Sequence, residues 1–213
     1  MVEWTILNLG QISRNRYWGE ADDRVYRPGI CNGIVLRDEK QNILVDPPFS
    51  DEEMLRILDS HAGLKPRDIH TVFITHGHVD HFEGIAFFPQ ARWVCYAPDH
   101  ERIAALLEKR GLDSRRLENA SERLTASIRV VPLPGHTRGS AGLLFPSWEG
   151  RVLAAGDAVM TRDFYRYRQG YYISEDQPRS VQTIDWIAQN ADVVIPGHDN
   201  YFLTAATKFN RED

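Results

Sequence analysis

Residues 71–81 read Thr-Val-Phe-Ile-Thr-His-Gly-His-Val-Asp-His, and this stretch decides the fold. Its first half is β-branched and aromatic, which predicts a buried strand. Its second half crowds three imidazoles and one carboxylate into a turn where that strand ends. Because zinc and neighbouring first-row metals take these groups as ligands, the pattern predicts a metal site. Residues 82–88 are predicted to begin a helix directly after it.

Three further candidate ligands follow strand-like runs later in the chain. His136 lies in Pro-Gly-His-Thr, Asp157 follows the apolar run 152–155, and His198 follows the apolar run 193–195. A glycine precedes each of the three. A lone histidine is more often an ordinary polar residue than a ligand, but buried polar groups that converge must find partners. Because strand ends collect functional side chains, we expect these residues to meet the first cluster in one cleft.

In their order along the chain, the candidates resemble the ligand set of the metallo-β-lactamase fold hydrolases. The matching residues are His76, His78, Asp80, His81, His136, Asp157 and His198. Ile-Leu-Val-Asp at 43–46 is similar to the auxiliary signature of that family. The resemblance covers nearly the whole chain, residues 36–198, and suggests a small single-domain member.

The predicted elements favour a mixed α/β (α+β) fold in one domain spanning residues 1–213. Strands and helices succeed one another in a way that suits a four-layer αββα sandwich of two stacked sheets with helices outside. The resemblance implies the same metallo-β-lactamase type of fold. From pattern alone the alternative is a doubly wound sheet, which is disfavoured because no glycine-rich phosphate loop follows the first strand.

Composition and charge limit the expected partners and cellular location of the protein. The chain has 213 residues and a net charge of −5, so no global basic surface recruits nucleic acid. It contains no apolar run long enough to cross a bilayer, and residues 1–5 lack the features of a signal peptide. We therefore expect a cytoplasmic protein. Cys31 and Cys95 are expected to be buried thiols rather than a disulfide.

The resemblance implies a role for each candidate ligand. It assigns His76, His78 and His136 to one metal ion, assigns Asp80, His81 and His198 to a second, and places Asp157 between the two. It also implies that Asp46 orients a ligand without binding metal itself. The expected cofactors are two Zn²⁺ ions, with Fe²⁺ and Mn²⁺ as alternatives. Asp80 is the candidate catalytic residue, because its carboxylate can also accept a proton from metal-bound water.

The leading functional hypothesis is a hydrolase that uses metal-bound hydroxide to cleave a small ester, thioester, lactone or phosphoester. A mononuclear non-haem iron sulfur dioxygenase on the same fold is one alternative, since iron binds the same ligand types. A non-catalytic binding protein is another. True β-lactamase activity is disfavoured because Asp157 stands where cysteine-containing members of the family carry a thiolate. Glyoxalase II activity is disfavoured because little chain follows His198, whereas that enzyme carries an extra helical domain. Nuclease activity is disfavoured because the net charge is acidic.

Two long loops supply candidate substrate contacts. The loop 11–29 carries Tyr17 and Trp18, which can wall the cleft or pack on the protein's own surface. Segment 161–176 carries Tyr165, Arg166, Tyr167 and Arg168, which in extended form would place aromatic rings on one face and guanidinium groups on the other. This segment can act as a lid, a substrate clamp or an interface, and a homodimer remains open. Arg138 follows the His136 motif, where it can point at the cleft and favour an anionic small-molecule substrate or equally face solvent.

Overall fold

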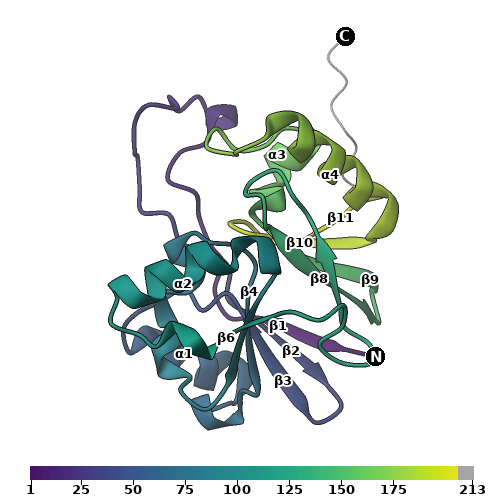
Figure 1. Cartoon of the computed structure of the whole chain (residues 1–213). Helices are drawn as coiled ribbons and strands as arrows, with labels where there is room; N and C mark the ends of the chain where they lie inside the picture. Colours follow the sequence, from purple (N-terminus) through teal and green to yellow (C-terminus); the bar gives the residue numbers. More distant parts are fainter. Residues whose placement is uncertain (206–213) are drawn as a thin grey trace.

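The computed structural model describes residues 1–205, and two β-sheets form the centre of this part of the chain (Figure 1). The first sheet has the order β1-β2-β3-β4-β5-β6 and the second has the order β11-β10-β9-β8-β7. The strands of the first sheet are β1 Glu3–Ile6, β2 Ile34–Asp38, β3 Gln41–Val45, β4 Thr71–Ile74, β5 Arg92–Cys95 and β6 Leu117–Asn119. Those of the second are β7 Arg129–Pro132, β8 Ala141–Ser147, β9 Gly150–Gly156, β10 Val193–Pro196 and β11 Phe202–Leu203.

Helices cover the outer face of each sheet, which confirms the predicted four-layer arrangement. The α-helices are α1 Glu53–Ala62, α2 His100–Lys109, α3 Arg162–Arg166 and α4 Gln177–Asn190. The 3-10 helices are η1 Arg16–Trp18, η2 Pro66–Asp68, η3 Val79–His81, η4 Glu83–Phe87, η5 Ala97–Asp99, η6 Ser114–Arg116 and η7 Asp157–Val159. In Figure 1, α1 and α2 lie beside the first sheet, whereas α3 and α4 lie beside the second. Within the described residues, no helix is long and apolar enough to span a membrane.

Residues of the inner strands are buried on both faces because each sheet is covered on both sides. In β3, Ile43 and Val45 pack in the core between the sheets, while Leu44 packs outward in the cluster beneath α1 and α2. In β9, Val152 and Leu153 divide in the same way between the central core and the cluster beneath α4. This alternation follows from the two-residue period of a strand.

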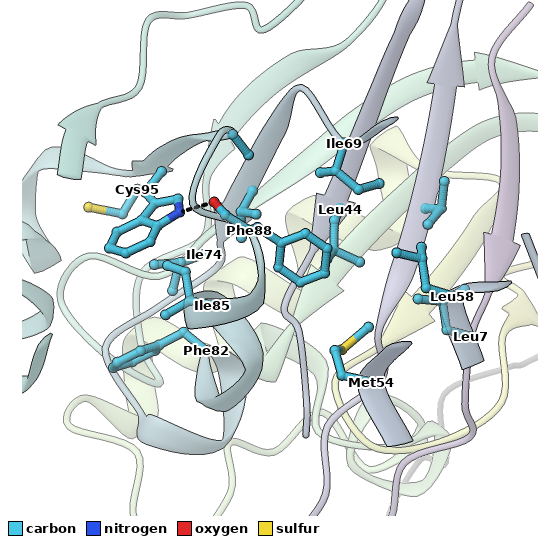
Figure 2. Close-up of a cluster of buried hydrophobic side chains, with 14 of the residues drawn as sticks. Leu7, Leu44, Met54, Leu58, Ile69, Ile74, Phe82, Ile85, Phe88 and Cys95 are labelled. Carbon is cyan, nitrogen blue, oxygen red and sulfur yellow. Dashed lines mark hydrogen bonds between the residues drawn. The ribbon is translucent and has the colours of Figure 1, made fainter. Parts of the chain in front are cut away.

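The outer core beneath α1 and α2 holds large side chains from several elements (Figure 2). Met54 and Leu58 of α1 pack there with Leu44 of β3, and Phe88 enters the same cluster from the loop before β5. The Trp93 indole N–H donates to the carbonyl of Phe88 at 3.0 Å. The buried ring therefore has its one polar atom satisfied. Cys31 and Cys95 are buried free thiols, as predicted.

The predicted helix over 82–88 proves to be only the short 3-10 helix η4. Gly84 packs so tightly that an added Cβ would lie 2.5 Å from the carbonyl oxygen of Phe49. Phe88 is fully buried, and Pro89 after it disfavours the helical conformation. Close packing at Gly84 and the local effect of Pro89 on Phe88 therefore both oppose a regular α-helix here.

Two parallel strand pairs bring the predicted site loops together. β3 pairs in parallel with β4, and β9 pairs in parallel with β10, so each pair ends at a common edge. The loops after β3 and β4 carry Asp46 and the cluster 76–81. The loops after β9 and β10 carry Asp157 and His198. Stacking of the sheets places these two edges against each other.

Candidate metal centre

The seven predicted ligands meet at this edge in two groups. One group contains His76, His78, His136 and Asp157, and the other contains Asp80, His81 and His198. Within each group the potential ligand atoms lie within 4.8 Å of one another. The division matches the one that the resemblance implied for two metal ions.

Asp157 lies between the groups and turns one carboxylate oxygen toward each. Its Oδ2 lies 3.3 Å from His136 Nε2 and 3.7 Å from His76 Nε2. Its Oδ1 lies 3.2 Å from both His81 Nε2 and His198 Nε2. A carboxylate in this position can bind two cations at once.

Hydrogen bonds at Nδ1 aim the Nε2 atoms of four imidazoles into the centre. His81 Nδ1 lies 2.8 Å from Asp46 Oδ2, and His198 Nδ1 lies 2.8 Å from the carbonyl of Ile30. His76 Nδ1 lies 3.1 Å from Thr75 Oγ1, and His136 Nδ1 lies 3.3 Å from Ser174 Oγ. Contacts of this kind fix ring orientation and leave the other nitrogen free to bind metal.

His78 is turned the other way, with Nδ1 toward the centre. This atom lies 3.0 Å from His76 Nε2 and 2.9 Å from His136 Nε2. Burial disfavours the imidazolium form of all three rings, so the pKa of each lies below its usual value. For His136 the pKa falls to about 4. These histidines are therefore neutral at pH 7, which is the form that binds metal.

The second group differs in its electrostatics. Burial lowers the pKa of His81 and His198, but the nearby carboxylates, with Asp157 foremost, outweigh it and raise both pKa values. Burial alone would raise the pKa of Asp157, but the surrounding imidazoles hold this pKa well below the usual range. The carboxylate is therefore ionised, and it attracts positive charge to this position.

Two buried atoms of the centre have no hydrogen-bond partner in the described chain. They are His81 Nε2 and Asp157 Oδ1, which face each other. Buried polar atoms without partners cost free energy, and a cation between them would satisfy both. Imidazole and carboxylate suit Zn²⁺, Fe²⁺ and Mn²⁺, so the residues present fit the predicted metal ions.

A small cleft of about 150 Å³ opens onto the centre. Besides His78, Asp80, Asp157 and His198, its lining comprises Ile12, Ser13, Gly29, Met160, Tyr171, Tyr172 and Ile173. The sequence reasoning missed these residues, which apart from Met160 belong to the two long loops. The loops meet over the cleft, where the Tyr171 hydroxyl donates to the carbonyl of Arg14 at 3.1 Å and lies 3.3 Å from Ser13 Oγ. Loop residues show no hydrophobic periodicity, so no sequence pattern identifies which of them line a cleft.

Tyr17 and Trp18 bind the first long loop to the second and are not part of the cleft lining. The Tyr17 ring stacks on Tyr167, with centroids 4.1 Å apart and planes at 6°. Trp18 Nε1 donates to Asp163 Oδ2 at 3.1 Å, although the side chain is exposed. Of the two interpretations open from the sequence, packing on the protein's own surface is the one that these contacts support.

The extended form considered for residues 165–168 does not occur, because α3 covers residues 162–166. Tyr165 is 2% exposed and packs in the core beneath α4, with its ring 4.9 Å from that of Phe202. Arg168 forms an ion pair with Asp185 of α4. Burial of the Tyr165 side chain inside the fold, rather than alternation along the segment, decides the local conformation.

The remaining predicted contacts, Arg138 and Arg166, are exposed and also lie outside the cleft lining. The Arg138 backbone N–H donates to Glu175 Oε2 at 2.8 Å, which ties its loop to the second long loop. The predicted arginine contacts are therefore not brought to the candidate metal centre.

Comparison with known proteins agrees with this geometry. Residues 26–198 match the family model of the metallo-beta-lactamase superfamily. The chain belongs to this superfamily. The predicted family and fold are thus confirmed.

Individual proteins resemble the chain over most of its length. The 2,4-dinitroanisole O-demethylase subunit alpha of Nocardioides sp. is 28% identical over 211 residues, covering 92% of this chain and 59% of the relative. Metallo-beta-lactamase domain-containing protein 1 of Xenopus laevis is 32% identical over 172 residues, covering 78% of this chain and 69% of the relative. The chain thus spans less than two thirds of the length of the first of these relatives.

A solved structure supports the fold. An N-acyl homoserine lactone hydrolase with the product N-hexanoyl-L-homoserine at its catalytic metal center superposes with a TM-score of 0.72 and 17% identity. The match covers 93% of this chain and 92% of that chain.

Proposed function

We propose that this protein is a metal-dependent hydrolase that cleaves a small ester, thioester or lactone at a two-metal centre. The observation that carries the proposal is Asp157, whose two carboxylate oxygens each face one group of potential ligands. Paired metal ions in such a centre lower the pKa of bound water and stabilise negative charge on the attacked group.

Each ligand group would hold one ion, and Zn²⁺ is the expected metal. The first position would be held by His76, His78 and His136, the second by Asp80, His81 and His198, with Asp157 shared. Asp80 is proposed to accept a proton as well. Its side chain is 34% exposed and lines the cleft, so it is open to water and substrate, unlike the buried Asp157.

The cleft lining favours an uncharged substrate. Apart from the potential metal ligands, the lining side chains in the described chain are apolar, hydroxyl or phenolic, and no lysine or arginine is among them. An anionic substrate would have only the proposed metal ions, and no cationic side chain of the lining, to pair with. We therefore rank neutral substrates above the anionic ones that Arg138 would favour if it faced the cleft, and rank charged phosphoesters last.

The solved N-acyl homoserine lactone hydrolase supports a lactone among these candidates, because the product of lactone opening lies at its catalytic metal center. The name of the Nocardioides relative adds a second candidate, 2,4-dinitroanisole, an uncharged aryl ether. Tyr171 and Tyr172 in the lining offer aromatic surfaces for such a ring.

The test begins with metal content, measured by plasma mass spectrometry on protein purified without chelator or added metal. Two zinc ions per chain are expected. Turnover is then compared on neutral p-nitrophenyl acetate, δ-valerolactone, a thioester and 2,4-dinitroanisole, and on anionic bis-p-nitrophenyl phosphate. Hydrolysis of a neutral substrate that Asp157→Asn abolishes supports the proposal. One iron per chain with oxygen uptake on a persulfide, or no turnover of any neutral substrate, would overturn it.

A further inference from the structure

Two buried side chains outside the ligand set, Asp99 and Asn32, each hold the loops of a different ligand group. They are 3% and 2% exposed, respectively. We propose that Asp99 is the positioning residue for the first metal position and that Asn32 is the positioning residue for the second. This inference rests on the proposed two-metal centre.

Asp99 joins two loops that are 58 positions apart at His78 and His136. Its Oδ2 accepts from the backbone N–H of Gly77 at 2.7 Å and from Thr137 Oγ1 at 2.7 Å. Gly77 lies between His76 and His78, and Thr137 follows His136 directly. The carboxylate thus spans the backbone on both sides of the first ligand group.

A third hydrogen bond and close packing strengthen this junction. Asp99 Oδ1 accepts from the backbone N–H of Gly139 at 3.0 Å. A Cβ added to Gly139 would lie 2.3 Å from the Asp99 nitrogen, and one added to Gly77 would lie 3.3 Å from Asp99 Oδ2. Both loops therefore press against this one side chain with no room between, and its three accepted hydrogen bonds require both carboxylate oxygens.

Asn32 has the corresponding place at the second group. Its Nδ2 donates to the carbonyls of Pro196 and Asp199, each at 2.7 Å, so these contacts lie on both sides of His198. Its backbone N–H donates to the carbonyl of Gly197 at 2.7 Å. The Asn32 side-chain oxygen accepts from Gly10 N at 2.6 Å, which ties the residue before the first long loop to the same point.

The chemistry of the two residues is opposite, which makes an isosteric exchange informative. Asp99 faces three donors, so Asp99→Asn must turn an amide N–H₂ toward at least one of them. Asn32 donates to two carbonyls, so Asn32→Asp would place carboxylate oxygen against carbonyl oxygen. Each exchange preserves side-chain volume but removes hydrogen bonds from one pair of loops.

The test isolates each metal position with a ligand variant. His198→Ala leaves the first group intact, whereas His136→Ala leaves the second. Zinc affinity is measured by chelator competition in each background, with and without the positioning variants. Asp99→Asn should weaken zinc binding about 10- to 100-fold in the His198→Ala protein, the range for residues that orient ligands. In the His136→Ala protein it should change zinc affinity by no more than about twofold, as for independent sites.

Asn32→Asp should show the reverse selectivity. Thr137→Val removes one of the Asp99 contacts and should weaken the first position more mildly, which keeps the idea testable if Asp99→Asn folds poorly. The matched control is Asp38→Asn, which changes a buried carboxylate that accepts from Thr125 in the described chain. It should leave both affinities as they are.

Equal loss of affinity in both backgrounds, or loss of thermal stability with unchanged affinities, would refute the positioning roles. If the positioning roles are refuted in this way but the wild-type protein binds two zinc ions, the proposed function is not contradicted. Conversely, a wild-type protein that binds no second ion would count against the two-metal centre itself, whatever the variants show.

Discussion

Asp46 Oδ2 lies 2.8 Å from His81 Nδ1, and this contact turns His81 Nε2 toward Asp157. The two Asp46 oxygens also accept from the backbone N–H and the hydroxyl of Thr75, at 2.8 Å and 2.7 Å. Asp46 reaches these partners with a backbone φ of 50°, a conformation that residues other than glycine seldom adopt. The end of β3 therefore fixes the residue before the histidine cluster and one histidine within it.

The first prediction concerns this contact. Asp46→Asn keeps one acceptor oxygen but turns an amide toward Thr75 or His81, so the ring loses part of its support. We expect zinc affinity and kcat/KM to fall about 10- to 100-fold, as for other residues that orient metal ligands. Chelator competition and steady-state kinetics measure the two effects. Zinc affinity equal to that of wild type would show that the ring is held without the carboxylate.

The second prediction concerns Gly197, which lies against the shared carboxylate. A Cβ added at this position would lie 2.0 Å from Asp157 Oδ1, closer than any contact allows. Gly197→Ala must therefore move either the carboxylate or the loop of His198, at a cost of about 1–3 kcal/mol in unfolding free energy. We expect loss of metal and activity in a protein that still folds. Circular dichroism with metal analysis checks this, and a fully loaded, active variant would contradict it.

The convergence of the candidate ligands could be predicted from the sequence because they follow apolar strand runs, and strand ends meet where parallel strands share an edge. Asp99 could not be found in this way. It lies at the N-cap of α2, where an aspartate ordinarily accepts from its own helix, yet it makes no such hydrogen bond. Its partners come from distant loops, and no local pattern encodes them.

The conformation of segment 165–168 could not be predicted from the sequence for a related reason. Its Tyr-Arg-Tyr-Arg alternation has the two-residue period of a strand, but Tyr165 is buried in the core and Tyr167 stacks on Tyr17. Long-range packing of the rings thus overrides the local period. Tyr171 and Ser13 could not be predicted as lining residues, because they come to the cleft only when the two long loops meet in the folded protein.

The third prediction concerns stability and pH. Hydrogen bonds and charge from Arg151 lower the pKa of Asp192 to about 2. The group's unfolded value is about 3.9, so its contribution is complete above that pH and is lost as pH falls toward the folded value. Both side chains are about half exposed, which limits the pair to about 1 kcal/mol or less of unfolding free energy.

Arg151→Met should therefore raise the pKa of Asp192 toward its ordinary value, while the backbone N–H of Arg151 still donates to it at 2.9 Å. Carbon-detected NMR titration of the carboxyl group measures this shift, and urea unfolding at pH 7 measures the loss of stability. An unchanged titration of Asp192 in the variant would refute the assignment of its low pKa to the guanidinium.

The last prediction concerns the junction of the two long loops over the cleft. Tyr171→Phe removes the hydroxyl that donates to the carbonyl of Arg14 and contacts Ser13, but it keeps the ring in the lining. One neutral hydrogen bond contributes about 1 kcal/mol, so the first loop should close over substrate less often and KM should rise about fivefold. Because the hydroxyl touches no potential metal ligand, kcat and zinc content should stay near wild type. Tyr167→Phe is the matched control, since phenylalanine keeps the ring that stacks on Tyr17. A fall in kcat with constant KM for Tyr171→Phe would instead place the hydroxyl in the chemical step.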